Sequence, residues 1–141
     1  MSKFKCRLKF SLNDFKGQRV ILYFYPKDNT SGCTQEACDF RDNINRLTSY
    51  ATVIGVSPDS IKSHKIFKEK QSLNFILLSD PEHKLAEKFE VWREKSMYGR
   101  KYMGIERSTF IIDKNGKIEK EWRKVKVKGH VDEVIEYLNV N

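Results

Sequence analysis

Residues 20–42 have the sequence VILYFYPKDNTSGCTQEACDFRD, and this stretch decides the fold. Its first six residues are β-branched, aromatic or leucine, which predicts a strand buried on both faces. Pro26 ends that strand, and a turn-forming segment follows at residues 27–32. Apolar residues at helical spacing then predict a helix from Thr34 onward. Cys33 therefore lies where a central strand gives way, through a loop, to a helix N-terminus.

The position of Cys33 favours a reactive sulfur atom. Free N–H groups and the positive end of the helix macrodipole both stabilise an anion at a helix N-terminus, so we expect a thiolate there. An inert buried side chain is the alternative, because free cysteine is among the most buried residue types. The strand–loop–helix position favours the nucleophile.

The motif around Cys33 resembles that of a known enzyme family. The run PKDNTSGC, which ends at Cys33, is similar to the P-x-x-x-T-x-x-C signature of the peroxiredoxins. Cys38, five residues later, resembles the resolving cysteine of the bacterioferritin comigratory protein (PrxQ) subfamily. Three later segments are similar to the same subfamily in order and spacing: LLSDPEH at 77–83, VWREK at 91–95 and YMGIERSTFIID at 102–113. The resemblance covers nearly all of the chain from Ser11 onward.

The resemblance implies a thiol-dependent peroxidase acting on hydrogen peroxide and organic hydroperoxides. In such an enzyme Cys33 would become a sulfenic acid, and Cys38 would condense with it to an intrachain disulfide. Thioredoxin or a similar dithiol would then reduce that disulfide. The resemblance also implies a catalytic set of Pro26, Thr30, Cys33 and Arg107, and no cofactor.

The chemistry of these residue types suits that role. A thiolate must attack one peroxide oxygen in line while the other oxygen leaves, so hydrogen-bonding groups are needed around both. Thr30 offers a hydroxyl that can donate to the peroxide or relay a bond near Cys33. Pro26 fixes the start of the loop, and Arg107 would supply a permanent cation. Without the motif, Thr30 would be an ordinary loop residue and Arg107 a surface charge.

The spacing of the two cysteines has a structural consequence. On an ideal helix, residues five apart have Cα atoms roughly 8–9 Å apart. A disulfide needs a Cα separation of roughly 4.4–6.8 Å. If Cys33 and Cys38 share one regular helix, we expect residues 34–40 to unwind locally during the catalytic cycle.

Two other functional classes are alternatives to the peroxidase. A general thiol–disulfide oxidoreductase on the same fold would use C-x-x-C, whereas the spacing here is C-x-x-x-x-C. A non-catalytic basic binding protein would leave Pro26, Thr30 and Arg107 without a purpose.

The net charge of +8 raises the question of nucleic-acid binding. Lysines alternate with acids along residues 62–70 and 82–90, as on solvated helix faces. A denser basic cluster interleaves with valines, as on the outer face of a strand: Arg123, Lys124, Lys126 and Lys128. Because no recognisable binding module is present, we expect no specific nucleic-acid binding.

The rest of the chain predicts an α/β protein with a thioredoxin-like fold, a central mixed sheet flanked by helices. Strands are expected at residues 4–12, 52–57 and 75–79, followed by a hairpin of strands 108–112 and 117–122. Helices are expected at residues 60–71, 82–89 and 130–138, the first with Ile61, Ile66 and Phe67 on its apolar side. Residues 94–104 are expected to form a loop, either at the rim of the active site or as core filling. We expect a single domain, 1–141.

The N-terminus departs from the family pattern. Members of the family usually begin further upstream. The resemblance therefore implies either a shortened N-terminus or an upstream segment that is missing from this sequence. Cys6 has no place in that pattern, and we expect it to be structural or incidental. His64, His83 and His130 lack metal-ligand spacing, so no metal site is expected.

Cysteine usage and hydropathy indicate the compartment. Three cysteines, two of them in a redox motif, fit a reducing environment with a catalytic disulfide, and we expect a cytoplasmic protein. No apolar run approaches the roughly 18 residues of a spanning helix, so no membrane association is expected. An intrachain cysteine pair is compatible with a monomer, which is the state we expect.

Overall fold

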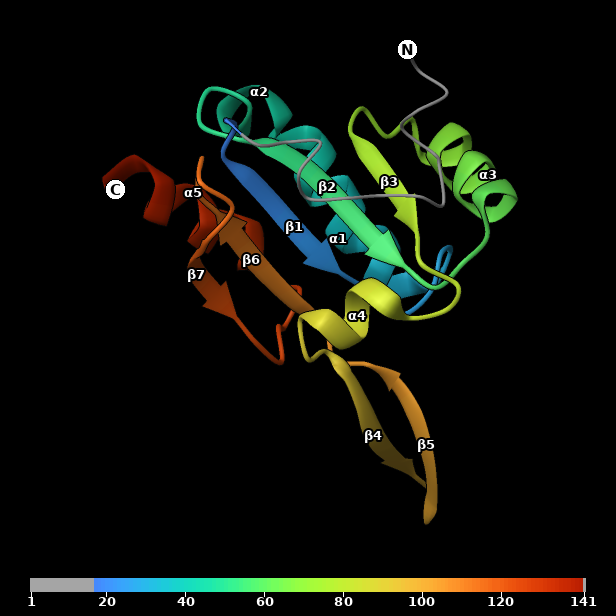
Figure 1. Ribbon diagram of the computed structural model, residues 1–141. Helices are drawn as coiled ribbons and strands as arrows, with labels where there is room; N and C mark the ends of the chain where they lie inside the picture. The colour runs from blue at the N-terminus through green and yellow to red at the C-terminus, as the bar shows by residue number, and fades with distance from the viewer. Residues whose placement is uncertain (1–16, 141) are drawn as a thin grey trace.

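The centre of the fold is a five-stranded sheet in the order β3–β2–β1–β6–β7 (Figure 1). The structure is a computed structural model, and residues 17–140 of it are described. The strand expected at residues 4–12 and Cys6 therefore lie outside the described residues. The strands are β1 (Val20–Phe24), β2 (Thr52–Ser57), β3 (Ile76–Ser79), β6 (Ser108–Ile112) and β7 (Ile118–Trp122). Because β1 pairs in parallel with β2 and antiparallel with β6, the sheet is mixed.

Helices cover both faces of this sheet. They are α1 (Ser31–Asp42), α2 (Ile44–Leu47), α3 (Ile61–Gln71), α4 (Lys84–Lys88) and α5 (His130–Val140). Residues of α1, α2, α3 and α5 share one apolar core with one face of the sheet, whereas α4 packs on the other (Figure 1). The expected thioredoxin-like arrangement is confirmed.

Strand β1 is buried on both sides, as its apolar sequence predicts. Each of its residues is at most 1% exposed. Ile21 and Tyr23 belong to the core shared with α1 and α5, and Val20, Leu22 and Phe24 belong to the core shared with α4. Each such side chain contributes on the order of 1.5–3 kcal/mol when it is fully buried, so this strand anchors both layers.

Residues 94–104 do not form the expected loop. They belong to a two-stranded antiparallel hairpin, β4 (Trp92–Met97) and β5 (Arg100–Ile105), which projects from the body of the molecule (Figure 1). Tyr98 and Gly99 connect the strands with φ values of 54° and 78°. Positive φ at both central residues is the geometry that lets a two-residue turn join twisted strands.

The apolar side expected for α3 is also partly wrong. Ile66 is 55% exposed, whereas His64 and Phe67 are the buried residues of this helix. His64 and Phe67 are three apart and so share a face. The buried face of α3 is therefore part polar, because His64 meets a buried carboxylate described below.

One helix boundary and the setting of the basic cluster differ from expectation. Helix α4 begins at Lys84 and not at Glu82, because the Asp80 carboxylate accepts the N–H groups of Leu85 and Ala86 and fixes the first turn there. Strand β7 ends at Trp122, so the basic cluster follows the strand instead of lining it. Its lysines are nevertheless exposed: Lys124, Lys126 and Lys128.

Candidate active site

Helix α1 begins three residues earlier than the sequence predicts. Its first residue is Ser31, with Thr30 in the extended N-cap position. Cys33 is therefore the third residue of the helix, inside the first turn. The Thr34 N–H makes the first helical bond, to the Thr30 carbonyl at 2.8 Å. The N–H groups that precede this bond give the first turn its affinity for an anion.

Strand pairing brings Arg107 to Cys33. Strand β1 runs into the loop that leads to Cys33, and its last residue, Phe24, pairs with Ser108, the first residue of antiparallel β6. Arg107 directly precedes Ser108, so it lies at the same edge of the sheet as the loop. Its carbonyl accepts the N–H of Val125 at 2.9 Å, which fixes the backbone there.

The Arg107 guanidinium contacts the Cys33 sulfur. Nη2 donates to Sγ at 3.2 Å, and Cys33 is only 1% exposed. Gly32 borders this contact, and a Cβ at that position would lie 3.4 Å from Nη2, which is ordinary van der Waals distance. Burial lowers the pKa of Arg107, but the negative charges of Glu36 and Cys33 outweigh that effect and raise it above its ordinary value. The site thus holds a permanent cation against a buried sulfur.

Glu36 is a member of this site that the sequence analysis missed. Its Oε1 accepts from Arg107 Nη1 at 2.5 Å, and the residue is fully buried. Its other oxygen, Oε2, has no hydrogen-bond partner among the described residues. Burial raises the pKa of Glu36 to about 7, although Arg107 opposes the rise. Glu36 was detectable in principle, because it lies three residues after Cys33 on the face that also carries Ala37 and Phe40.

Thr30 and Pro26 lie on the loop before α1. The Thr30 hydroxyl is exposed and donates to the Lys27 carbonyl at 2.9 Å. No side-chain cap bond runs from Thr30 into α1. Pro26 is half-buried directly after β1. The hydroxyl therefore has a local turn bond, while its lone pairs stay available to an incoming ligand.

Cys38 lies on the same helix as Cys33, further from the N-terminus. Its Sγ faces the Gln71 side chain, with 3.7 Å to Oε1, at the end of α3. Arg41 Nη1 donates to the Gln71 carbonyl at 2.7 Å. Neither Cys33 nor Cys38 is in a disulfide, so the structure shows the helix before any disulfide forms.

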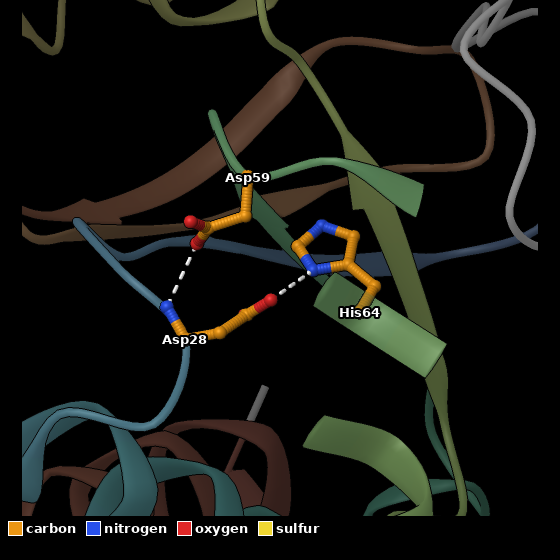
Figure 2. Close-up of side chains that lie close together, drawn as sticks. All are labelled: Asp28, Asp59 and His64. Atoms are coloured by element: carbon orange, nitrogen blue, oxygen red, sulfur yellow. Dashed lines mark hydrogen bonds and ion pairs between the residues drawn. The ribbon is translucent and has the colours of Figure 1, made fainter. Parts of the chain in front are cut away.

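A second polar group lies beside the site, at the ends of β1 and β2 (Figure 2). Candidate ligand atoms of Asp28, Asp59 and His64 all lie within 4.8 Å of one another, a grouping that could in principle hold a metal ion. Each of these side chains is already hydrogen-bonded. His64 Nδ1 meets Asp28 Oδ2 at 2.7 Å, and Nε2 meets the Leu78 carbonyl at 2.8 Å. Since both ring nitrogens are engaged, the donor set fits a hydrogen-bonded cluster better than a metal centre.

The neighbours of Asp28 favour its ionised form. Burial raises the pKa of its carboxyl, but hydrogen bonds from His64, Tyr25 and Ser63 outweigh that effect and hold it below its ordinary value. The residue pattern alone does not indicate that Asp28, Asp59 and His64 form a cluster. The available signal was that Asp28 and Asp59 each closely follow a buried strand, and that those two strands pair in parallel.

A family model and named sequence relatives match most of this chain. The family model described as AhpC/TSA family matches residues 6–121. The chain is 60% identical to "Peroxiredoxin Bcp" of Bacillus subtilis over 128 residues, which cover 90% of this chain and 82% of the relative. It is 47% identical to "Peroxiredoxin Bcp" of Escherichia coli K12 over 129 residues, covering 91% and 83% of the two chains.

Solved structures agree with the sequence relatives. The bacterioferritin comigratory protein of Xanthomonas campestris, described for its alkyl peroxide reduction activity, superimposes with a TM-score of 0.88 at 43% identity. That match covers 93% of this chain and 84% of the other. A mutant of Xanthomonas campestris peroxiredoxin Q gives a TM-score of 0.89 at 44% identity, with the same coverage.

Proposed function

The chain belongs to the AhpC/TSA family and is a peroxiredoxin, and from this premise we propose which of its residues reduce peroxides. Cys33 is the peroxidatic residue. The observation that carries this assignment is the 3.2 Å contact between Arg107 Nη2 and the sulfur of a buried cysteine in the first turn of α1. A fixed cation and helix N–H groups stabilise the thiolate, which is the nucleophilic form.

The first chemical step forms a sulfur–oxygen bond. The Cys33 thiolate attacks the hydroxyl oxygen of the hydroperoxide, the O–O bond breaks, and the leaving hydroxide or alkoxide takes a proton from water. Cys33 becomes a sulfenic acid and the peroxide becomes water or an alcohol. Arg107 stabilises the negative charge as it moves from sulfur to the leaving oxygen. Thr30 accepts a hydrogen bond from the peroxide, and Pro26 holds the loop in place. The alkyl peroxide activity described for the Xanthomonas campestris relative supports organic hydroperoxides as substrates.

The second step joins the two cysteines. The thiol of Cys38 condenses with the Cys33 sulfenic acid, releasing water and forming a disulfide. Cys33 and Cys38 both lie on the continuous helix α1, which is the arrangement that requires local unwinding before a disulfide can form. Their ideal helical separation of roughly 8–9 Å exceeds what a disulfide spans. The Arg107–Glu36 ion pair opposes this unwinding near the N-terminus of α1. The Arg41–Gln71 bond opposes it toward the C-terminus.

A dithiol protein closes the cycle. One of its thiolates attacks the Cys33–Cys38 disulfide to form a mixed disulfide, and its second thiol releases both cysteines of this chain in the reduced state. Thioredoxin is the reductant expected for this family. A monomer suffices for this cycle because both cysteines come from one chain, and a cytoplasmic location remains a prediction. Among residues 17–140, no helix is long and apolar enough to cross a bilayer.

Peroxide consumption by cysteine variants tests the assignment. The reduced protein is mixed with hydrogen peroxide and with thioredoxin plus its reductase. Cys33→Ser should consume no peroxide, and Cys38→Ser should lose thioredoxin-coupled turnover while still forming a sulfenic acid. Cys6→Ser, which changes the one cysteine outside the motif, is the matched control and should behave as the wild type. Peroxide turnover by Cys33→Ser would overturn the assignment.

Amide hydrogen exchange tests the unwinding step. Phe40 stacks on Tyr23 with ring centroids 4.5 Å apart and is fully buried, so unwinding as far as Phe40 would expose core surface. We expect residues 34–40 to lose protection when the protein is oxidised to the disulfide, while β1 keeps its protection. Equal protection of the segment in both redox states would contradict the switch.

A further inference from the structure

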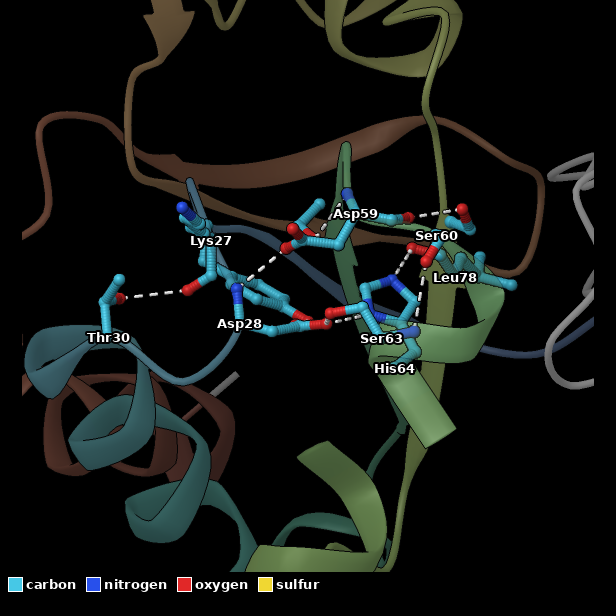
Figure 3. Close-up of polar contacts among 11 residues, drawn as sticks. Lys27, Asp28, Thr30, Asp59, Ser60, Ser63, His64 and Leu78 are labelled. Atoms are coloured by element: carbon cyan, nitrogen blue, oxygen red, sulfur yellow. Dashed lines mark hydrogen bonds and ion pairs between the residues drawn. The ribbon is translucent and has the colours of Figure 1, made fainter. Parts of the chain in front are cut away.

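The Asp28–Asp59–His64 cluster lies outside the Cys33–Arg107 site, but its hydrogen bonds end on the loop that carries Thr30 (Figure 3). The buried Asp28 carboxylate accepts from Tyr25 at 2.6 Å, from Ser63 at 2.7 Å and from His64 at 2.7 Å. Tyr25 directly follows β1, and Ser63 and His64 lie on α3, so three contacts from two segments hold the Asp28 side chain.

The cluster also fixes one peptide group of the loop. The amide between Lys27 and Asp28 donates its N–H to Asp59 Oδ2 at 2.7 Å. The carbonyl of the same amide accepts from the Thr30 hydroxyl at 2.9 Å. Because a peptide unit is planar and rigid, holding the N–H fixes the direction of the carbonyl. Asp59 therefore determines where the Thr30 proton can go.

The direction of that proton matters for a peroxide. A threonine hydroxyl has one proton to donate and two lone pairs that accept. With its proton on the Lys27 carbonyl, Thr30 can only accept a hydrogen bond from the O–H of an approaching hydroperoxide. Without that carbonyl in place the hydroxyl could rotate and donate to other acceptors, and the peroxide would lose a defined partner.

The cluster also holds the His64 ring between two oxygen atoms. Its Nδ1 lies 2.7 Å from Asp28 Oδ2, and its Nε2 lies 2.8 Å from the Leu78 carbonyl oxygen. The side chains of His64 and Asp28 are both only 1% exposed, so the ring fixes the buried Asp28 side chain from α3.

We infer that Asp28 and Asp59 are positioning residues for the peroxide reaction, which fix the Thr30 hydroxyl as an acceptor through the peptide group between Lys27 and Asp28. His64 supports them by holding the Asp28 side chain in place. The inference rests on the proposed function, because it concerns the reaction of Cys33 with peroxide. It assigns a role to a cluster that touches neither the sulfur nor the substrate.

Two reactions of the Cys33 sulfur distinguish a role in positioning Thr30 from a general role in protein stability. The rate constant of Cys33 with hydrogen peroxide depends on Thr30, whereas its rate constant with iodoacetamide depends on the thiolate alone. Asp59→Ala and Asp28→Ala should lower the peroxide rate constant roughly 10- to 100-fold, as misplacement of a reacting geometry does. The iodoacetamide rate constant should stay unchanged. A parallel fall in both constants, or no change in the peroxide constant, would overturn the inference.

Matched variants sharpen the comparison. Asp59→Asn keeps an oxygen that can accept the Asp28 N–H, so it should restore most of the peroxide rate that Asp59→Ala loses. Ser60→Ala removes the N-cap bond that the Ser63 N–H donates at 3.1 Å and leaves the loop untouched, so it should destabilise α3 without slowing the peroxide reaction. If an alanine variant fails to fold, Ser63→Ala removes a single bond to Asp28 and should still slow the peroxide reaction selectively. An Asn variant as slow as the Ala variant, or a slow Ser60→Ala variant, would contradict the role.

A double-mutant cycle tests the route of the effect. In a Thr30→Val background there is no hydroxyl to orient, so adding Asp59→Ala should cause no further loss of the peroxide rate. A further loss of the same size would show that Asp59 acts elsewhere. The wild type and Cys33→Ser are measured alongside. A wild type that ignores peroxide would contradict the proposed function itself, whereas unaffected variants of a reactive wild type would contradict only the positioning role.

Discussion

Replacing Glu36 by glutamine should change how the stability of the reduced protein depends on pH. Burial raises the pKa of this carboxyl from 4.5 to about 7 in the folded protein. Between these values the unfolded chain binds fewer protons than the folded protein, so the wild type loses stability as the pH rises and then levels off above about pH 7. A difference of about 2.5 in pKa, at about 1.4 kcal/mol for each pH unit, corresponds to a loss on the order of 3 kcal/mol.

Urea unfolding at a series of pH values between about 4 and 8 measures this loss. All other titrating groups are common to both proteins, so they cancel in the difference between the Glu36→Gln variant and the wild type. That difference should shift in favour of the variant by on the order of 3 kcal/mol across the range. Glu136→Gln, at an exposed position on α5, is the control for removing a surface carboxyl. A Glu36→Gln difference that is independent of pH would refute the reasoning, and would mean that Arg107 keeps Glu36 ionised throughout.

The effects of three further substitutions can be predicted from the local contacts of the replaced residues. Arg107→Lys keeps a positive charge but loses the forked guanidinium that contacts both Cys33 and Glu36. Stopped-flow kinetics should therefore show a peroxide rate constant that is lower by about tenfold or more. A wild-type rate constant would contradict the role of the guanidinium. Tyr23→Phe removes a buried hydroxyl with no hydrogen-bond partner among the described residues. The free energy of unfolding, measured in urea, should therefore rise by about 1 kcal/mol. A clear fall in this free energy would show that the hydroxyl has a hydrogen-bond partner. Gly55→Ala would place a Cβ 2.9 Å from the Tyr23 ring and 3.0 Å from the Leu77 side chain. It should therefore lower the free energy of unfolding by about 1–3 kcal/mol in the same assay. An unchanged free energy would show that the Tyr23 ring can move.

The inner strands of the sheet could be predicted from sequence because they are short and strongly apolar, whereas the exposed edge strand β7 was predicted from its hairpin turn. Strand β1 and strand β2 are buried along almost their whole length, and this produces continuous apolar runs that are easily recognised. The hairpin β4–β5 gives no such signal. Most of its residues are exposed on both faces, so no apolar alternation marks it as a strand pair.

The site could be predicted only in part. Cys33, Cys38, Thr30 and Pro26 lie within one short motif, so their proximity follows from the chain itself. Arg107 is distant in sequence, and only the antiparallel register of β1 with β6 explains its position next to Cys33. The resemblance to a known family supplied that residue, since residue pattern alone does not determine the register.

The charged residues behind the site were harder to find. Glu36 and His64 occupy helix positions that an apolar residue would normally fill, and sequence analysis assigns a charged side chain to the solvated face by default. Ile66 shows the opposite error, an apolar residue that the helix turns toward solvent. Buried polar residues of this kind become visible only when their partners, here Arg107 and Asp28, are placed in space.

The most direct test of the mechanism is to locate the oxidised sulfur. Reduced Cys38→Ser protein is treated with an equimolar amount of hydrogen peroxide in the presence of dimedone, and the modified residue is identified by peptide mass spectrometry. The mechanism predicts that the dimedone adduct forms on Cys33, and that it is lost when Arg107 is also replaced by methionine. An unmodified Cys33, or an adduct that forms equally well without Arg107, would contradict the claim that a buried thiolate held by this guanidinium attacks the peroxide.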